Sequence, residues 1–167
     1  MSTLSLFEEP KTQDIIIYTD GACLGNPGPG GLGLVIIEGE SEKQFAEGYK
    51  LTTNNRMEIM AAVKALYMIG NQTRNIKLYS DSNLLVAAHK DGWLRNWQRN
   101  NWKKSDKKPV LNRDLWEALL EAEKPHKIEF IWVKGHANNH YNEICDKISR
   151  DAAEFPVLKD DVGYQTI

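Results

Sequence analysis

Short apolar runs alternate with longer segments of helical period along this chain. Five of the runs are rich in Ile, Val, Leu, Phe and Tyr, and this composition predicts β-strands. They span residues 15–19, 32–39, 42–51, 75–80 and 127–135. Only short links separate the first three runs, so we expect them to form an antiparallel meander.

The remaining segments carry apolar residues at the spacing of one helix face. They span residues 52–70, 81–90, 110–123 and 140–155, with a further short helix and a basic loop within 92–109. Residues 20–31 are dense in Gly, Pro and Asn, which is typical of a turn. This order of elements predicts an α/β fold, in which a mixed sheet is flanked by helices.

Length and composition fit one globular domain. The chain has 167 residues, of which 41% are hydrophobic and 26% are charged, as in ordinary folded proteins. We expect a flexible leader over 1–13, one folded domain over 14–155 and a C-terminal tail over 156–167. No run of about 18 apolar residues occurs, so we expect no membrane span.

The two cysteines bear on the compartment. Cys23 and Cys145 are too few for a disulfide framework, and they lack the Cys/His spacing of a zinc site. The first residues, MSTLSLFEEPKTQ, lack the basic start and the long apolar run of a secretory signal. We therefore expect a cytoplasmic protein.

Charge is distributed unevenly along the chain. The formal net charge is -2, but residues 1–14 and 154–167 each carry -2, which leaves +2 for the body. Within the body, residues 93–108 carry six basic side chains against one acid, a net charge of +5. This distribution leaves nucleic acid open as a partner.

Four acidic residues occupy positions that a simple core pattern would not give them. Asp20 ends the most apolar strand, and Asp81 directly follows another strand. Glu58 shares a helix face with alanine and isoleucine, so we expect its side chain to point inward. Asp146 lies beside an apolar stripe of the last helix.

Taken singly, these acids have ordinary interpretations as a turn residue, a helix cap and helix-surface acids. Taken together, they could gather at one end of the sheet. Carboxylates about 4 Å apart repel by roughly 4 kcal/mol per pair at a dielectric near 20, so such a cluster must take up protons or cations. Oxygen ligands suit Mg²⁺ or Mn²⁺, and several acids with open coordination positions fit a two-metal phosphoryl-transfer centre.

Four motifs, in this order, strongly resemble those of bacterial type 1 ribonuclease H. They are TDGACLGNPGPGG, TTNNRMEIMAA, YSDSN and VKGHANNHYNEICD. The similarity runs from Asp14 to Gln165 and includes the closing DDVGYQ. It implies a ribonuclease H-like fold with a five-stranded mixed sheet flanked by helices, and it makes residues 14–155 the catalytic domain.

The resemblance also implies an activity. It points to an endoribonuclease that cuts the RNA strand of RNA–DNA hybrids by a two-metal-ion mechanism and leaves 5′-phosphate products. Asp20, Glu58, Asp81 and Asp146 would act in catalysis and bind one or two Mg²⁺ ions, with Mn²⁺ as a substitute. His136, which would otherwise be taken for a surface residue, would assist proton transfer or product release.

By the same resemblance, short polar side chains near the acids would read the 2′-hydroxyl in the minor groove of the hybrid. The candidates are Cys23, Asn26, Asn54, Asn55 and Asn83. Asn54 and Asn55 could equally be helix caps, and Asn83 stands where many relatives have Gln. Thr53 and Asn112 would bind a phosphate of the DNA strand.

Residues 93–108 match the basic protrusion of the bacterial family. Lys103 and Lys104 are expected to meet DNA phosphates. Trp93 is also a candidate substrate contact, although its spacing from Trp97 fits a core or self-stacking anchor equally well.

Two alternatives remain open at this stage: a catalytically silent hybrid-binding module, and another nuclease of the same fold. The four intact acids argue against the first. The NNRME helix, the Trp-rich basic segment and the GHAN loop argue against the second. We expect a monomer whose partner is an RNA–DNA hybrid.

Overall fold

The computed structural model describes residues 13–135 and 138–164, so nearly all of the expected leader lies outside it. Its centre is a five-stranded sheet in the order β3-β2-β1-β4-β5. The strands are β1 (Ile15–Cys23), β2 (Gly28–Glu38), β3 (Ser41–Thr52), β4 (Asn75–Ser80) and β5 (Lys127–Trp132). β1, β2 and β3 pair antiparallel, whereas β4 and β5 run parallel to β1. The predicted mixed sheet and meander are confirmed.

The largest difference from expectation concerns the turn predicted over 20–31. β1 continues to Cys23 and β2 begins at Gly28, so only residues 24–27 connect the two strands. Gly21 and Gly31 of this segment are strand residues that a helix approaches closely. A Cβ at Gly31 would lie 2.1 Å from the carbonyl oxygen of Ser149. The absence of a side chain lets the helix pack directly against the strand. Composition alone did not distinguish this role from turn formation.

The helices begin and end close to the predicted positions. They are α2 (Asn54–Ile69), α3 (Asn83–Lys90), α4 (Trp93–Arg99), α5 (Arg113–Glu123) and α6 (His140–Ala152). The Thr53 side chain caps α2, because it accepts a hydrogen bond from the Arg56 backbone N–H at 3.2 Å. None of the helices in the described ranges combines the length and apolarity needed to cross a membrane.

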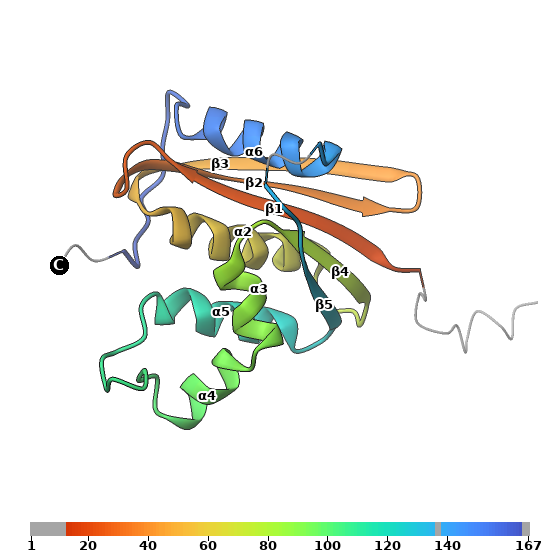
Figure 1. Cartoon of the computed structure of the whole chain (residues 1–167). Helices are drawn as coiled ribbons and strands as arrows, with labels where there is room; N and C mark the ends of the chain where they lie inside the picture. Colours follow the sequence, from red (N-terminus) through yellow and green to blue (C-terminus); the bar gives the residue numbers. More distant parts are fainter. Residues whose placement is uncertain (1–12, 136–137, 165–167) are drawn as a thin grey trace, which may run out of the picture.

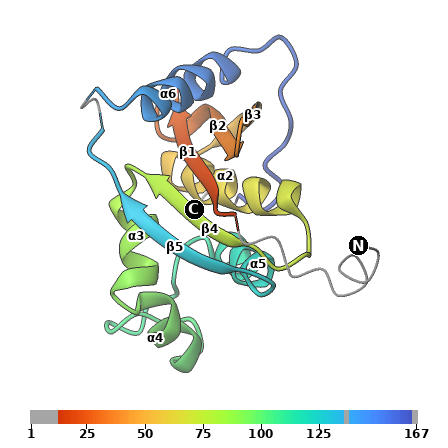
Figure 2. The same cartoon turned by 90° about the vertical axis from the view of Figure 1, so that its right-hand side faces the viewer.

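The helices cover both faces of the sheet. α6 packs on β1, β2 and β3 from one side, while α2 packs on β1 and β2 from the other and contacts α5 (Figure 1). Ile17, Leu78, Met57 and Trp116 are among the buried core side chains. α3 contacts β5, and α4 with its basic loop projects from the body at the end remote from α6 (Figure 2).

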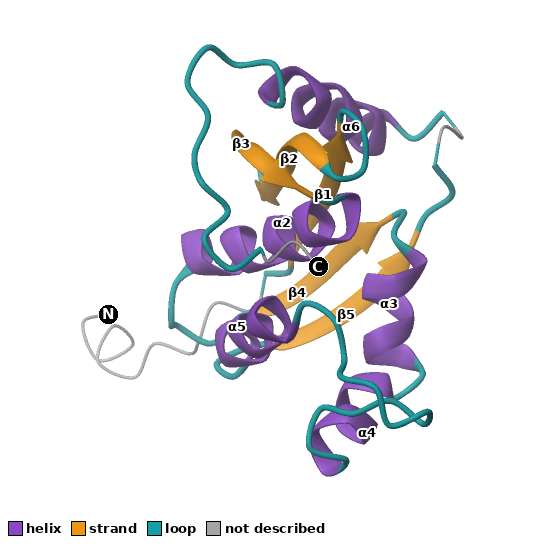
Figure 3. Cartoon of the chain, turned by 90° about the vertical axis from the view of Figure 1, so that its left-hand side faces the viewer, coloured by secondary structure: helices purple, strands orange, loops and turns teal. Residues whose placement is uncertain are grey.

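The chain after α6 returns along the outer edge of the sheet. Lys159 donates a backbone hydrogen bond to Gly48 at 2.9 Å and accepts one from Lys50 at 2.8 Å. The segment then passes from β3 toward α2 (Figure 3). This C-terminal segment, residues 156–164, therefore packs on the same body as the strands and helices.

Candidate active site

Asp20 and Asp81 emerge side by side at the carboxyl edge of the sheet. β1 and β4 are parallel neighbours, and Thr19 is paired with Ser80. Asp20 and Asp81 are the residues that directly follow this pair, so strand register alone brings the two carboxylates together. Asp20 is only 5% exposed.

Glu58 joins this pair because α2 lies directly on β1. A Cβ at Gly21 would lie 2.5 Å from the backbone nitrogen of Glu58 and 2.6 Å from the carbonyl carbon of Met57. Glycine at position 21 therefore lets the first turns of α2 touch the strand next to Asp20. The prediction that Glu58 points inward is confirmed by its place in the cluster.

Asp20, Glu58 and Asp81 form a compact acidic cluster. Each offers a carboxylate oxygen, and these oxygens lie within 4.8 Å of one another. Burial raises the pKa of Asp20 to about 8, and the charges of Asp81, Glu58 and Asp146 add to this rise against a hydrogen bond from Gly21. Burial also raises the pKa of Glu58 to about 7; Asp81 adds to it, whereas a hydrogen bond from Ser82 opposes it.

This donor set fits a divalent cation. Three carboxylates so close together repel one another, and hard oxygen donors are the ligands that Mg²⁺ and Mn²⁺ prefer. A bound cation would compensate the charge that burial and mutual repulsion disfavour. The acidic cluster is thus a candidate metal site.

Asp146 lies on α6 beside the cluster rather than in its compact centre. Its carboxylate accepts hydrogen bonds from Arg150 Nη2 at 2.9 Å and Nε at 3.1 Å. Its charge nevertheless contributes to the raised pKa of Asp20. The structure therefore brings three of the four predicted acids into one group and places the fourth within electrostatic reach.

His136 lies outside the described residues, but the chain leading to it borders the cluster. A Cβ at Gly135 would lie 3.1 Å from Asp81 Oδ2. Trp132, at the end of β5, donates from Nε1 to the Asp81 carbonyl oxygen at 3.2 Å. The loop after β5 therefore starts beside the acidic cluster.

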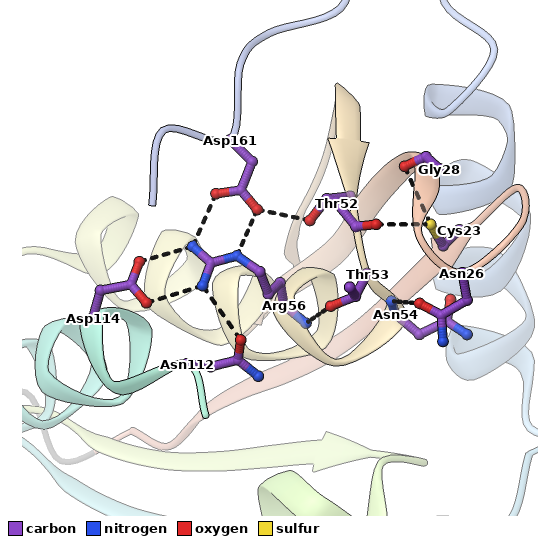
Figure 4. A network of polar contacts seen from close by, with 10 residues as sticks. All are labelled: Cys23, Asn26, Gly28, Thr52, Thr53, Asn54, Arg56, Asn112, Asp114 and Asp161. Carbon is purple, nitrogen blue, oxygen red and sulfur yellow. Dashed lines mark hydrogen bonds and ion pairs between the residues drawn. The ribbon is translucent and has the colours of Figure 1, made fainter. Parts of the chain in front are cut away.

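Four of the predicted substrate residues line one groove, which we call the polar groove. Its volume is about 820 Å³, and it is lined by Asn26, Thr53, Asn55 and Asn112 together with Arg56 and Tyr164. Asn26 Oδ1 accepts a hydrogen bond from the Asn54 backbone N–H at 3.2 Å (Figure 4). The Cys23 thiol contacts the carbonyl oxygens of Gly28 at 3.3 Å and Thr52 at 3.4 Å.

The other predicted substrate residues lie apart from this groove. Asn83 is exposed at the start of α3. Trp93 is 38% exposed and lies 6.2 Å from Trp97 between ring centroids, so it also anchors α4. Lys103 and Lys104 are exposed in the loop after α4.

Sequence reasoning missed an ion-pair network beside the polar groove. Arg56 is held by Asp114 on α5 and by Asp161 in the C-terminal segment, with shortest distances of 2.7 and 2.6 Å (Figure 4). Burial works against the charges, but hydrogen bonds with these acids raise the pKa of Arg56, and those from Arg56 lower the pKa of Asp114. The available signal was an arginine inside the motif TTNNRMEIMAA, on a helix face that is otherwise apolar.

Together, the fold and the acidic cluster define a class of protein: an α/β nuclease with a carboxylate site at the edge of a mixed sheet. The RNase H family pattern matches residues 12–154. Ribonuclease H of Syntrophus aciditrophicus (strain SB) is 53% identical over 157 residues, which cover 94% of this chain and 90% of that protein. The chain belongs to the RNase H family.

Solved structures agree with this assignment. LC9-RNase H1 superposes with a TM-score of 0.78 at 27% identity, covering 88% of this chain and 75% of that one. LC11-RNase H1, solved in complex with an RNA/DNA hybrid, has a TM-score of 0.63 at 25% identity and covers 84% of this chain and 96% of that one. The predicted ribonuclease H-like fold is confirmed.

Proposed function

We propose that this protein is an endonuclease that hydrolyses the RNA strand of RNA–DNA hybrids and leaves 5′-phosphate ends. The observation that carries the proposal is the convergence of Asp20, Glu58 and Asp81 within the RNase H fold. The complex of LC11-RNase H1 with an RNA/DNA hybrid supports the choice of substrate.

Asp20, Glu58 and Asp81 would hold one or two Mg²⁺ ions, or Mn²⁺ in their place, and Asp146 would complete the set from α6. When bound, such ions activate water and neutralise charge that builds on the phosphate. The three clustered carboxylates also repel the backbone of an approaching nucleic acid unless they are compensated. Hybrid binding and cation binding are therefore coupled at this edge of the sheet.

His136 would assist proton transfer or product release, because an imidazole with an ordinary pKa near 6.5 exchanges protons readily around neutral pH. The start of its loop beside Asp81 supports this role. It is an auxiliary group, since the acids and their cations deal with most of the charge.

The surrounding polar residues would hold the hybrid. Thr53 and Asn112 are proposed to bind a phosphate of the DNA strand in the polar groove, and Lys103 and Lys104 to meet further phosphates. The remaining contacts, to the minor groove and sugars, are assigned to Cys23, Asn26, Asn54, Asn55, Asn83 and Trp93. These assignments rest on family resemblance and, for Asn26, Thr53, Asn55 and Asn112, on their shared lining of the polar groove.

We further propose that residues 14–155 form the catalytic unit and that the protein acts as a monomer in the cytoplasm. Both cysteines are free thiols, as is usual in a reducing compartment. The C-terminal segment packs on this unit.

A substrate panel tests the proposed function. Labelled RNA–DNA hybrid, duplex RNA and duplex DNA are incubated with the protein, with Mg²⁺ or with a chelator. We expect cleavage of the RNA strand of the hybrid alone, only with Mg²⁺, and products that carry 5′-phosphates. Binding without cleavage would instead reveal a silent hybrid-binding module, and cleavage of duplex DNA would reveal a different nuclease of this fold.

A further inference from the structure

We propose that Asp161, in the C-terminal segment, is a positioning residue for the polar groove and acts through Arg56 on Asn112. The inference rests on the proposed role of Thr53 and Asn112 in holding a DNA phosphate. It makes the C-terminal segment part of the substrate-binding machinery rather than an appendage.

The guanidinium of Arg56 is fully occupied within the protein. It has five N–H donors. Asp161 receives two of them at 2.6 and 2.9 Å, Asp114 receives two at 2.7 and 2.9 Å, and Asn112 Oδ1 receives the fifth at 3.3 Å. The side chains of Arg56 and Asp161 are only 3% and 2% exposed. Arg56 therefore has no donor left for a substrate, and its role is to hold its neighbours.

Asn112 is the neighbour through which this arrangement reaches the groove. Its backbone is left-handed, with φ 62° and ψ 30°, at the start of α5. Because Arg56 can only donate, the side-chain oxygen of Asn112 must face it, and the amide nitrogen is left on the other side (Figure 4). Arg56 thus fixes which end of the amide can donate a hydrogen bond to a phosphate.

Asp161 is itself held from the other side of the network. Its Oδ2 accepts a hydrogen bond from Thr52 Oγ1 at 2.7 Å, and Thr52 is fully buried at the end of β3. Two positions earlier, Lys159 pairs with the backbone of β3. Two positions later, Gly163 begins the stretch that lines the polar groove with Tyr164. The segment is therefore anchored before it reaches Arg56 and contributes to the groove after it.

Charge and positioning make opposite predictions for the loss of Asp161. Arg56 with its two carboxylates carries a net charge of -1 beside a groove proposed to bind an anion. If Asp161 acted only through its charge, removing that charge would strengthen hybrid binding. If it positions Arg56 and Asn112, removing it weakens binding despite the gain in positive charge.

Asp161→Asn and the control Asp160→Asn separate these cases. Both substitutions remove one negative charge. Asp160, however, is exposed, and its carboxylate forms a surface ion pair with Lys50 Nζ at 3.6 Å. Steady-state cleavage of a labelled hybrid should show KM raised about tenfold for Asp161→Asn with kcat changed less than about twofold. Asp160→Asn should leave KM unchanged or slightly lower.

A double-mutant cycle shows whether the effect passes through Asn112. In an Asn112→Ala background, Asp161→Asn should raise KM by much less than tenfold, roughly twofold or under, because the positioned amide is already gone. Melting temperatures are measured for every variant. Thr52→Val removes one hydrogen bond to Asp161 with little change in shape and should raise KM in the same direction by a smaller factor, which keeps the test valid if Asp161→Asn fails to fold.

The inference is overturned if Asp161→Asn matches Asp160→Asn in KM, if kcat falls while KM stays constant, or if the two substitutions of the cycle act additively. Failure of the proposed function looks different, because the unchanged protein would then not cleave the hybrid at all.

Discussion

At the scale of single residues, Asp20 is an acid whose ionisation the fold strongly opposes. Burial is the main cause, and the charge of Asp81 is the next. Its pKa rises from an ordinary 3.8 to about 8, while that of Glu58 rises from 4.5 to about 7. Between pH 3.8 and about 8 for Asp20, and between pH 4.5 and about 7 for Glu58, the folded protein keeps a proton that the unfolded chain has released.

The sign of the resulting pH dependence follows from linkage. Where the folded state binds more protons, stability falls as pH rises. The contribution of protonated Asp20 to the free energy of unfolding is complete below about pH 4 and is lost as the pH rises toward about 8. The contribution of protonated Glu58 is lost by about pH 7. Without divalent cations, we expect the unfolding free energy measured in denaturant to decline across this window.

Asp20→Asn should remove much of this decline. An asparagine oxygen can still accept the hydrogen bond that Gly21 donates at 2.8 Å, but the side chain carries no charge. In chelator at pH 8, we expect the free energy of unfolding to increase by roughly 1–3 kcal/mol. Asp14→Asn, an exposed position just before β1, is the control and should change little. A less stable Asp20→Asn protein at pH 8 would show that the carboxylate is not disfavoured there.

The acids were accessible to sequence reasoning because each follows a recognisable strand or shares an apolar helix face. Parallel pairing of β1 and β4 then determines that Asp20 and Asp81 meet. The environment of Arg56 was not accessible, because Asp161 is 105 positions away and Asp114 is 58. Neither acid interrupts a periodic pattern, so nothing local marks it as the partner of a buried arginine.

At the scale of elements, the distance between α2 and β1 positions Glu58. Gly21 permits the contact, since a Cβ there would collide with backbone atoms of Met57 and Glu58. Backbone cannot move aside as a flexible side chain can, so a larger residue must displace the helix. Gly21 in the motif TDGAC is therefore required for the packing of the site, whereas the Gly, Pro and Asn content of residues 20–31 indicated only a turn.

Gly21→Ala tests this role. We expect a loss of roughly 1–3 kcal/mol in unfolding free energy from overpacking, and a fall in kcat of up to about 100-fold because Glu58 is displaced. Gly39→Ala is the control: φ is +60° in the turn between β2 and β3, so a Cβ there strains the backbone at the end of β2 opposite the connection to β1. It should lose similar stability and much less activity. Equal loss of activity in both variants would mean that general destabilisation, not the position of Glu58, is responsible.

At the scale of the whole molecule, charge is separated along the body. The basic loop after α4 projects from the end remote from α6 (Figures 1 and 2). The C-terminal segment brings acidic residues to the edge of β3 and to Arg56. The net charge of -2 therefore conceals a surface that can attract a nucleic-acid backbone.

Reversing Lys103 and Lys104 to Glu should weaken hybrid binding and reduce the slope of log affinity against log salt by about 1–2. Binding is measured by a salt titration with labelled hybrid. Lys124 and Lys127 provide a control with the same change in net charge, because they lie at the end of α5 and the start of β5, away from the carboxyl edge of the sheet. If both double variants reduce the slope equally, the effect is one of total charge and the loop after α4 is not a binding surface.

The succession of strands and helices along the chain and the mixed sheet were predictable, since hydrophobic periodicity and family motifs point to the same fold. The close approach of helices to glycine-bearing strands was not, because periodicity does not report the distance between layers. The pairing of the C-terminal segment with β3 was not predictable either, because it joins residues far apart in the sequence.

The most direct test of the central claim is Mg²⁺-dependent cleavage of a labelled RNA–DNA hybrid by Asp20→Asn beside Asp14→Asn, two substitutions near opposite ends of β1. Replacing one charged carboxylate of the acidic cluster with a neutral amide should lower the cleavage rate by roughly 1,000-fold or more at every Mg²⁺ concentration, with Asp14→Asn close to the unchanged protein. Near-normal cleavage by a folded Asp20→Asn protein would contradict the account.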